Sequence, residues 1–232
     1  MNPETIQQIP SVSDLQGVIC QCRRCPRLVE WREKIASEKV ARFQNCEYWG
    51  KPVPSLGRAS AKLLIVGLAP AAHGGNRTGR IFTGDRSGDW LYRALHANGF
   101  SNQPRSADRH DGLKLIDCYI TAVLHCAPPQ NKPLPQEIMN CRPFLIRELQ
   151  LLRQVQVIVA LGMLAFDQIW TLLNPVDRRP CFRHGLEVSL ANHKTLIASF
   201  HPSQQNTFTG KLTAPMLHSI FSRARQLIQS RF

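Results

Sequence analysis

The cysteines of this chain have the spacing of ligands to a metal centre. Cys22 and Cys25 form a C-x-x-C pair in "CQCRRCP", and Cys126 and Cys141 form a second pair with fourteen residues between them. Four thiolates can hold either a tetrahedral zinc ion or a 4Fe-4S cluster, and the residue types alone leave both open. The other four cysteines are interpreted as small hydrophobic side chains of the core: Cys20, Cys46, Cys118 and Cys181.

Composition and charge indicate the compartment and the class of partner. The 232 residues include 29 Lys and Arg against 16 Asp and Glu, a formal net charge of +13, which predicts binding to a polyanion, nucleic acid above all. Residues 1–19 lack the features of a signal peptide, and no apolar run approaches the ~20 residues of a membrane span. We therefore expect an intracellular, cytoplasmic protein with no membrane association, where disulfides are disfavoured and cysteines are free to bind metal.

Two polar segments carry the other residues that could do chemistry. The glycine-rich loop "GLAPAAHGGNRTGRIFTGD" (67–85) follows the apolar run "KLLIVG", and "HPSQQNTFTGKLT" (201–213) follows "KTLIASF". Small residues let a backbone approach a ligand closely, so the first loop is typical of a binding site. The sequence contains no P-loop and no HExxH motif, and phosphotransfer and metalloprotease chemistry therefore have no support.

The elements that position these segments follow from the hydrophobic pattern. Four apolar, β-branched runs predict strands buried on both faces, as in a parallel sheet: 62–69, 117–124, 155–162 and 194–200. Helical patterns alternate with them, at 87–98, 136–153, 162–173 and 213–230. This alternation predicts an α/β fold, a four-stranded parallel central sheet flanked by helices, in a single domain spanning residues 1–232. Ligands of such folds gather at the carboxyl ends of the strands, where the polar segments lie.

Taken together, the loop at 67–85, the C-x2-C and C-x14-C pairs and "HPSQQNTFTG" resemble the uracil-DNA glycosylases of the iron–sulfur branch, most of all family 5. The resemblance runs from Cys22 to about Pro215 and implies the three-layer fold expected above. It favours a structural 4Fe-4S cluster over zinc, with the two cysteine pairs as ligands and residues of about 20–60 as an N-terminal cluster-binding segment. It also implies a DNA repair enzyme that flips uracil, and other deaminated or damaged bases, out of DNA and removes them by hydrolysis.

The resemblance assigns the base-binding residues. The flipped base would stack on Phe82, thirteen residues after Ala69, and His201 would donate a hydrogen bond to the uracil oxygen on which charge develops. The remaining substrate contacts are expected from small or polar residues of the two segments: Gly67, Leu68, Ala69, Ala71 and Asn206.

The residue that positions water is less directly indicated, because Ala69 stands where many relatives of the wider superfamily have Asp or Asn. Asn76 is the first candidate for this catalytic role, Asp85 the second and His73 the third. Asp85 equally suits the N-cap of the next helix. Ala122 replaces an Asn that reads the uracil edge in relatives, and Ala71 replaces a bulky residue that excludes the thymine methyl group; both indicate a broad substrate range.

The DNA contacts are expected from the same segments. Arg77 and Arg80 would bind phosphates, Phe208 would fill the gap left by the flipped base, and Lys211 would contact a phosphate. Because the motifs place no lysine where a Schiff-base nucleophile is expected, the enzyme is predicted to be monofunctional, leaving an abasic site. We expect a monomer. The alternative is a catalytically inactive iron–sulfur or zinc-stabilised nucleic-acid-binding protein.

Overall fold

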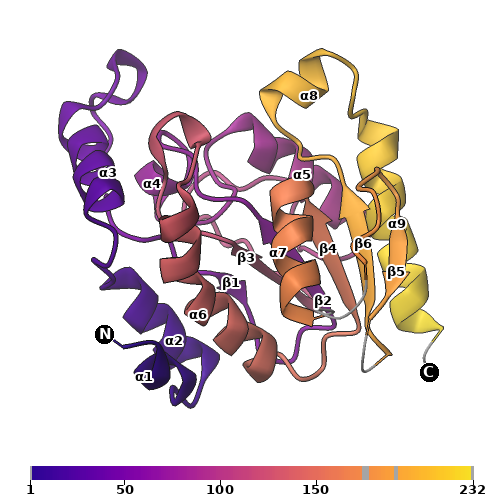
Figure 1. The fold of residues 1–232 in the computed structure, drawn as a ribbon. Helices are drawn as coiled ribbons and strands as arrows, with labels where there is room; N and C mark the ends of the chain where they lie inside the picture. Colours follow the sequence, from indigo (N-terminus) through magenta and orange to yellow (C-terminus); the bar gives the residue numbers. More distant parts are fainter. Residues whose placement is uncertain (1, 174–177, 191–192, 231–232) are drawn as a thin grey trace.

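A central sheet lies between layers of helices in the computed structural model, which describes residues 2–173, 178–190 and 193–230 (Figure 1). Its strand order is β1-β3-β2-β4-β6-β5. None of the helices in the described ranges is long and apolar enough to cross a membrane.

The four predicted strands form the parallel centre of this sheet: β2 (Leu63–Gly67), β3 (Cys118–Ala122), β4 (Val157–Leu161) and β6 (Thr195–Ser199). Every residue of these strands is buried, which explains their continuous apolar sequence. Two short antiparallel edge strands, β1 (Leu56–Gly57) and β5 (Glu187–Ser189), extend the predicted four strands to six. Both are partly exposed and too short to give an apolar run.

The predicted helices cover the two faces of the sheet. On one face, α5 (Arg86–Ala97) and α9 (Ala214–Gln229) pack against alternate strand residues such as Leu63 and Ile65. On the other face, α6 (Pro135–Leu151) and α7 (Met163–Leu173) pack against Leu64 and Val66. The alternation of side chains along each strand therefore gives one hydrophobic core on each face.

The N-terminal region adds helices that the sequence did not predict: α1 (Pro3–Gln7), α2 (Val12–Cys20), α3 (Pro26–Glu38) and the 3-10 turn η1 (Ala41–Phe43). Ile6, Leu15 and Ile19 form a third, smaller core with Phe144 of α6. Figure 1 shows α1 and α2 beside α6, and α3 on the side of α4.

Short elements at the carboxyl ends of the strands carry the polar segments. They are α4 (Gly75–Thr78) after β2, the 3-10 turn η2 (Pro129–Asn131) after β3, and α8 (Gln204–Phe208) after β6. Strands β2 and β4 are neighbours, while the chain continues from β2 to β3 on one side and from β4 to β6 on the other. The crevice at such a switch in strand order is where open α/β sheets bind ligands.

Candidate functional site

The Phe82 side chain packs against Gly67, the last residue of β2. Its side chain is 8 % exposed and its backbone has a φ of +52°, a conformation that bulky residues rarely adopt. The ring lies on Gly67, where an added Cβ would come within 2.7 Å of Phe82 Cζ. Gly88, in the first turn of α5, lies directly against the Phe82 carbonyl group. Such strain persists only where the surroundings impose it, and it clusters at functional sites.

His201 meets Phe82 although the two residues follow different strands. Their rings are 5.9 Å apart between centroids, with 30° between the planes. Asn206 Nδ2 donates a hydrogen bond to the His201 carbonyl oxygen at 2.9 Å, and the Asn206 backbone N–H donates to Ser203 Oγ, which caps α8. The structure therefore brings together the predicted stacking and hydrogen-bonding residues, and it gives Asn206 a role in holding the histidine segment.

The environment of His201 keeps its imidazole neutral. Burial lowers the pKa of His201 from the ordinary 6.5 to about 4, because the surrounding protein disfavours the charged form. At neutral pH the ring therefore has one N–H donor and one acceptor. It can donate a hydrogen bond to an oxygen on which negative charge develops.

Asn76 is completely buried in α4. Its Nδ2 donates a hydrogen bond to the Arg32 carbonyl oxygen at 3.2 Å, and its Oδ1 has no partner among the described residues. Because a carbonyl can only accept, this contact fixes the orientation of the amide and leaves Oδ1 as the free acceptor. A buried acceptor without a partner is costly and suggests a ligand or a water.

Asp85 has the N-cap role that the sequence offered as an alternative. Its Oδ1 accepts a hydrogen bond from Gly88 N at 2.9 Å at the start of α5. The other oxygen lies against Gly74, where an added Cβ would be 2.3 Å away. Burial raises the pKa of the Asp85 carboxyl group, which makes it a stronger base than an ordinary aspartate. His73, the third candidate, shares a 3.0 Å hydrogen bond between its Nδ1 and Tyr48 Oη.

The remaining predicted base contacts lie in the turn between β2 and α4. Backbone hydrogen bonds run from Val123 N to the Gly67 carbonyl and from Leu124 N to the Leu68 carbonyl. These bonds extend the pairing of the two strands to the edge of the site. Ala69 and Ala71 are partly buried in this turn, and Ala122 is buried at the end of β3. Their predicted contacts with a base remain predictions.

The two arginines of the loop serve its internal structure. Arg77 donates from Nε to the His73 carbonyl at 2.8 Å and from Nη2 to the Gly84 carbonyl at 3.2 Å. Arg80 is 6 % exposed and forms a 2.7 Å ion pair with Asp111. The predicted phosphate contact of Arg80 is therefore wrong in this structure, since a guanidinium so buried and paired cannot reach a DNA backbone.

The segment after β6 presents an apolar side chain to solvent. Phe208, at the end of α8, is 66 % exposed, and the Arg86 guanidinium lies 4.3 Å from its ring centroid. Lys211 is exposed, with its ammonium 4.9 Å from the centroid of Phe200. An exposed aromatic ring with one cation beside it suits the predicted wedge between bases.

The four selected cysteines line one pocket, between α3, the end of β3 and α6. Cys22 and Cys25 lie just before and at the start of α3, Cys126 follows β3, and Cys141 is in α6. Of the cysteines interpreted as core residues, Cys118 is buried. The interpretation is wrong for Cys181, which is exposed, and Cys20 and Cys46 are only partly buried.

The side chains around this pocket suit an anionic sulfur-ligated group. Arg32 is 2 % exposed and donates from Nη1 to Cys126 Sγ at 3.0 Å, and Asn140 Nδ2 lies 3.5 Å from Cys25 Sγ. Two other residues, Arg24 and His125, also line the pocket. Arg24 Nη1 and His125 Nε2 are buried and have no hydrogen-bond partner among the described residues. Hydrogen bonds to the sulfurs and buried positive charge are what an iron–sulfur cluster needs.

Within the described ranges, no three His, Cys, Asp or Glu side chains converge closely enough to hold one ion. Zinc needs its thiolates about 2.3 Å from one point, whereas the thiolates of a 4Fe-4S cluster bind separate irons. Four thiolates with nearby donors supply the ligands that either group requires, and the choice of the cluster is a proposal.

Sequence reasoning missed most of the residues that surround the sulfur atoms. Arg24 lies inside "CQCRRCP" and could have been noticed there. Arg32 and Asn140 carry no local signal, because their contacts depend on how α3 and α6 pack. Arg32 also connects the pocket to Asn76 through its carbonyl group.

Comparison with known proteins agrees with this geometry. Residues 54–225 match the model of the uracil DNA glycosylase superfamily. A type-5 uracil-DNA glycosylase of Mycobacterium leprae is 50 % identical over 94 % of this chain and 96 % of its own length. Those of Thermus thermophilus and Pyrobaculum aerophilum are 46 % and 43 % identical, over 89 % and 91 % of this chain and 93 % and 91 % of their own lengths. A strained aromatic beside a neutral histidine at the carboxyl ends of β2 and β6, and similarity that covers the chain almost throughout, thus lead to one conclusion: the chain belongs to the type-5 group of the uracil-DNA glycosylase superfamily.

Proposed function

We propose that this protein removes uracil from DNA by hydrolysing the bond between base and deoxyribose, which leaves an abasic site for repair. The observation that best supports this activity is the pairing of Phe82 with His201 at 5.9 Å. Relatives with 43–50 % identity carry the name of the same activity.

The chemistry follows from the charges that develop as the bond breaks. A base cannot be excised inside the stack, so the nucleotide rotates into the site and the uracil ring stacks on Phe82. Positive charge then grows on the sugar, as in glycoside hydrolysis, and negative charge grows on the departing base. The neutral His201 donates a hydrogen bond to a uracil oxygen and stabilises that charge.

A polar group must also position the attacking water. Asn76 has a free Oδ1 whose orientation Arg32 fixes, and it is the first candidate. Asp85 is the second, because burial raises its pKa and its base strength. Asp85→Asn keeps an N-cap, since Asn caps helices as well as Asp does, but removes the base. Comparing single-turnover rates of Asn76→Ala and Asp85→Asn therefore separates the two roles.

The cysteine pocket is proposed to hold a 4Fe-4S cluster on Cys22, Cys25, Cys126 and Cys141. When bound, the cluster supplies cross-links between the start of α3, the loop after β3 and α6. The chain's own residues do the rest: Arg32 and Asn140 donate hydrogen bonds to the sulfurs. The cluster is proposed to hold the loops in position and to take no direct part in base release.

The pocket for the base is proposed to accept more than uracil. Ala69, Ala71 and Ala122 place small side chains around it, so the site has few groups that would clash with a larger or differently substituted ring. Hypoxanthine, xanthine, ethenocytosine and 5-hydroxymethyluracil are the candidate bases. Release of uracil alone would contradict this breadth.

DNA is bound as a duplex by a monomer in the cytoplasm, in contact with the nucleoid. Phe208 enters the space vacated by the flipped nucleotide, and Lys211 contacts a neighbouring phosphate. Phe208→Ala should therefore slow release from a paired uracil more than from a uracil in a single strand, where no duplex has to be opened.

The test is base release from labelled duplexes that contain one modified base. Strand breaks that appear only after hot alkali indicate a monofunctional glycosylase. Breaks without alkali would contradict hydrolysis without a lyase step. No release from any of these duplexes by iron-loaded protein would instead favour the inactive nucleic-acid-binding protein, which the absence of a polar residue at Ala69 keeps open.

A further inference from the structure

A layer of aromatic rings and cations lies beside α4, outside the site described above. Phe43 of η1 lies between two guanidinium groups: Arg77 is 3.9 Å and Arg42 is 5.0 Å from its ring centroid. Arg77 comes from the loop that carries the candidate catalytic residues, whereas Arg42 is exposed. The stacked ring thus places two positive charges close together at the surface.

Trp49 repeats this arrangement. Lys51 Nζ lies 5.5 Å and the Arg109 guanidinium 4.8 Å from its ring centroid, and both cations are exposed. The indole lies flat on Gly79, the left-handed residue that ends α4, where an added Cβ would be 2.9 Å from the ring. We call the set of Arg42, Phe43, Trp49, Lys51, Arg77 and Arg109 the basic flank.

The basic flank is attached to the catalytic loop through the backbone. Trp49 N donates to the Arg77 carbonyl at 2.9 Å, and Gly50 N donates to the Asn76 carbonyl at 3.0 Å. A ligand held by the flank is thereby held in a fixed position relative to Asn76.

The cations of the flank form no close ion pair among the described residues. In the part of the chain that the structure describes, no carboxylate lies within 4.0 Å of the four cations. The acidic side chain of the same segment, Glu47, is exposed. Cation–π contacts of exposed groups are weak. Four cations gathered from three segments therefore favour an anionic partner.

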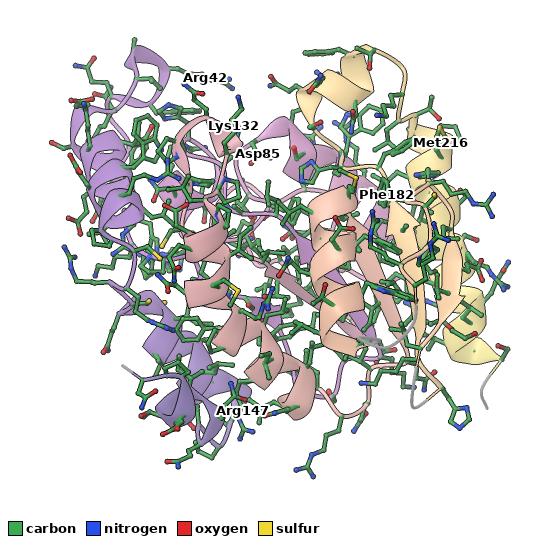
Figure 2. All side chains as sticks on the ribbon, in the orientation of Figure 1. Arg42, Asp85, Lys132, Arg147, Phe182 and Met216 are labelled. Atoms are coloured by element: carbon green, nitrogen blue, oxygen red, sulfur yellow. The ribbon has the colours of Figure 1, made fainter. Side chains whose placement is uncertain are left out.

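The flank lies on the same side of the sheet as the carboxyl ends of its strands. In Figure 1 the chain after α3 lies on one side of the top of the molecule, and α8 lies on the other side. The loops at the carboxyl ends of the strands lie between them. Figure 2 labels Arg42 on the first of these sides, with Asp85 between it and α8. The two sides could contact a duplex on either side of a flipped nucleotide.

We propose that the basic flank binds the phosphate backbone of duplex DNA, across the site from Phe208 and Lys211. The inference rests on the proposed function for its ligand. It adds a second anchor, in which Arg77 of the glycine-rich loop is joined by residues outside the motifs of the family: those of the turn after α3, and Arg109 in the connection that leads to β3.

The salt dependence of DNA binding tests this proposal. Each phosphate contact that is lost lowers the slope of log K against log salt by about 0.9, so Arg42→Gln/Lys51→Gln should reduce the slope by about 1.8 for a uracil-free duplex. The matched control is Arg58→Gln/Arg153→Gln, two exposed arginines at the opposite, amino ends of β2 and β4. The control should keep the slope of the wild type.

A slope for Arg42→Gln/Lys51→Gln equal to that of the wild type would overturn the proposal. Arg42→Glu and Arg42→Gln give a second comparison at one exposed position, and the affinity of Arg42→Glu should fall further, because it replaces the positive charge with a negative one instead of only removing it. A slope that changes as expected in a protein that releases no base would leave the basic flank intact and reject the proposed glycosylase activity. Base release with an unchanged slope would reject the flank alone.

Discussion

Arg32, buried in α3, donates a hydrogen bond from Nη1 to Cys126 Sγ at 3.0 Å. The carbonyl group of the same arginine accepts a hydrogen bond from Asn76 Nδ2. One residue therefore connects the sulfur-lined pocket with the loop that is proposed to position water, and the N-terminal helices support the site as well as the fold.

Replacing Arg32 should destabilise the protein. Arg32→Gln removes a buried charged donor from Cys126 Sγ and from the Cys22 carbonyl, and hydrogen bonds to charged groups contribute about 1.5–3 kcal/mol. We expect a loss of that size in the free energy of unfolding, measured by denaturant titration, and weaker visible absorption from the cluster. Arg23→Gln is the control, because Arg23 forms an exposed ion pair with Glu33 and should change neither property. Unfolding of Arg32→Gln at the denaturant concentration of the wild type would contradict this role.

Removing a cysteine ligand should remove the cluster. Cys141→Ser is expected to purify colourless and with little iron, whereas Cys20→Ser, outside the pocket lining, should stay brown with the iron content of the wild type. Absorption spectra and metal analysis of both variants measure this. Zinc in place of iron in the wild-type protein would contradict the cluster.

The sequence predicted the parts of the fold that have strong local signals. The four buried strands and the helices between them appear within a few residues of their expected positions. A continuous apolar run such as "VIVAL" predicts a buried strand, and an apolar stripe predicts a helix. Edge strands β1 and β5 are too short to carry such a pattern, whereas α2 has an apolar stripe of Val12, Leu15 and Ile19 that the sequence analysis missed. The burial of Arg80 depends on Asp111, thirty-one residues away, so a loop arginine that looked free for DNA could not be recognised as an internal one.

The same contrast holds for the site. The positions of Phe82 and His201 after two strands of a parallel sheet were enough to bring them together. The free oxygen of Asn76 and the neutral state of His201 depend on packing by residues from other segments, which no motif contains.

Gly67→Ala should slow base release as well as lower the stability of the protein. The added methyl group would press on the Phe82 ring, with a cost to folding of about 1–3 kcal/mol. Because a misplacement of about 1 Å can cost 100-fold in rate, we expect a loss of that order in single-turnover release of uracil. Gly17→Ala in α2, where an added Cβ meets nothing within 4 Å, should keep the wild-type rate. Equal rates for both variants would show that base release does not depend on the close packing of the Phe82 ring on Gly67.

The pH dependence should show no titration of His201 near neutrality. Burial lowers its pKa to about 4, so the ratio of wild-type to His201→Ala release rates should stay constant from about pH 8 to pH 5. In the unfolded chain this histidine takes up a proton near pH 6.5, about its unperturbed value. The wild type should therefore lose stability relative to His201→Ala as the pH falls from about 6.5 to 4, because only the unfolded state gains the proton. A rate ratio that changes with a midpoint near 6.5 would contradict the neutral imidazole.

The central claim is that His201 stabilises the departing base, and the most direct measurement is single-turnover release of uracil from a duplex by the wild type and by His201→Ala. Removing one donor to a developing negative charge costs about 100- to 1,000-fold in rate, and we expect a loss in that range with DNA affinity unchanged. Release by His201→Ala within a few-fold of the wild-type rate would contradict the account.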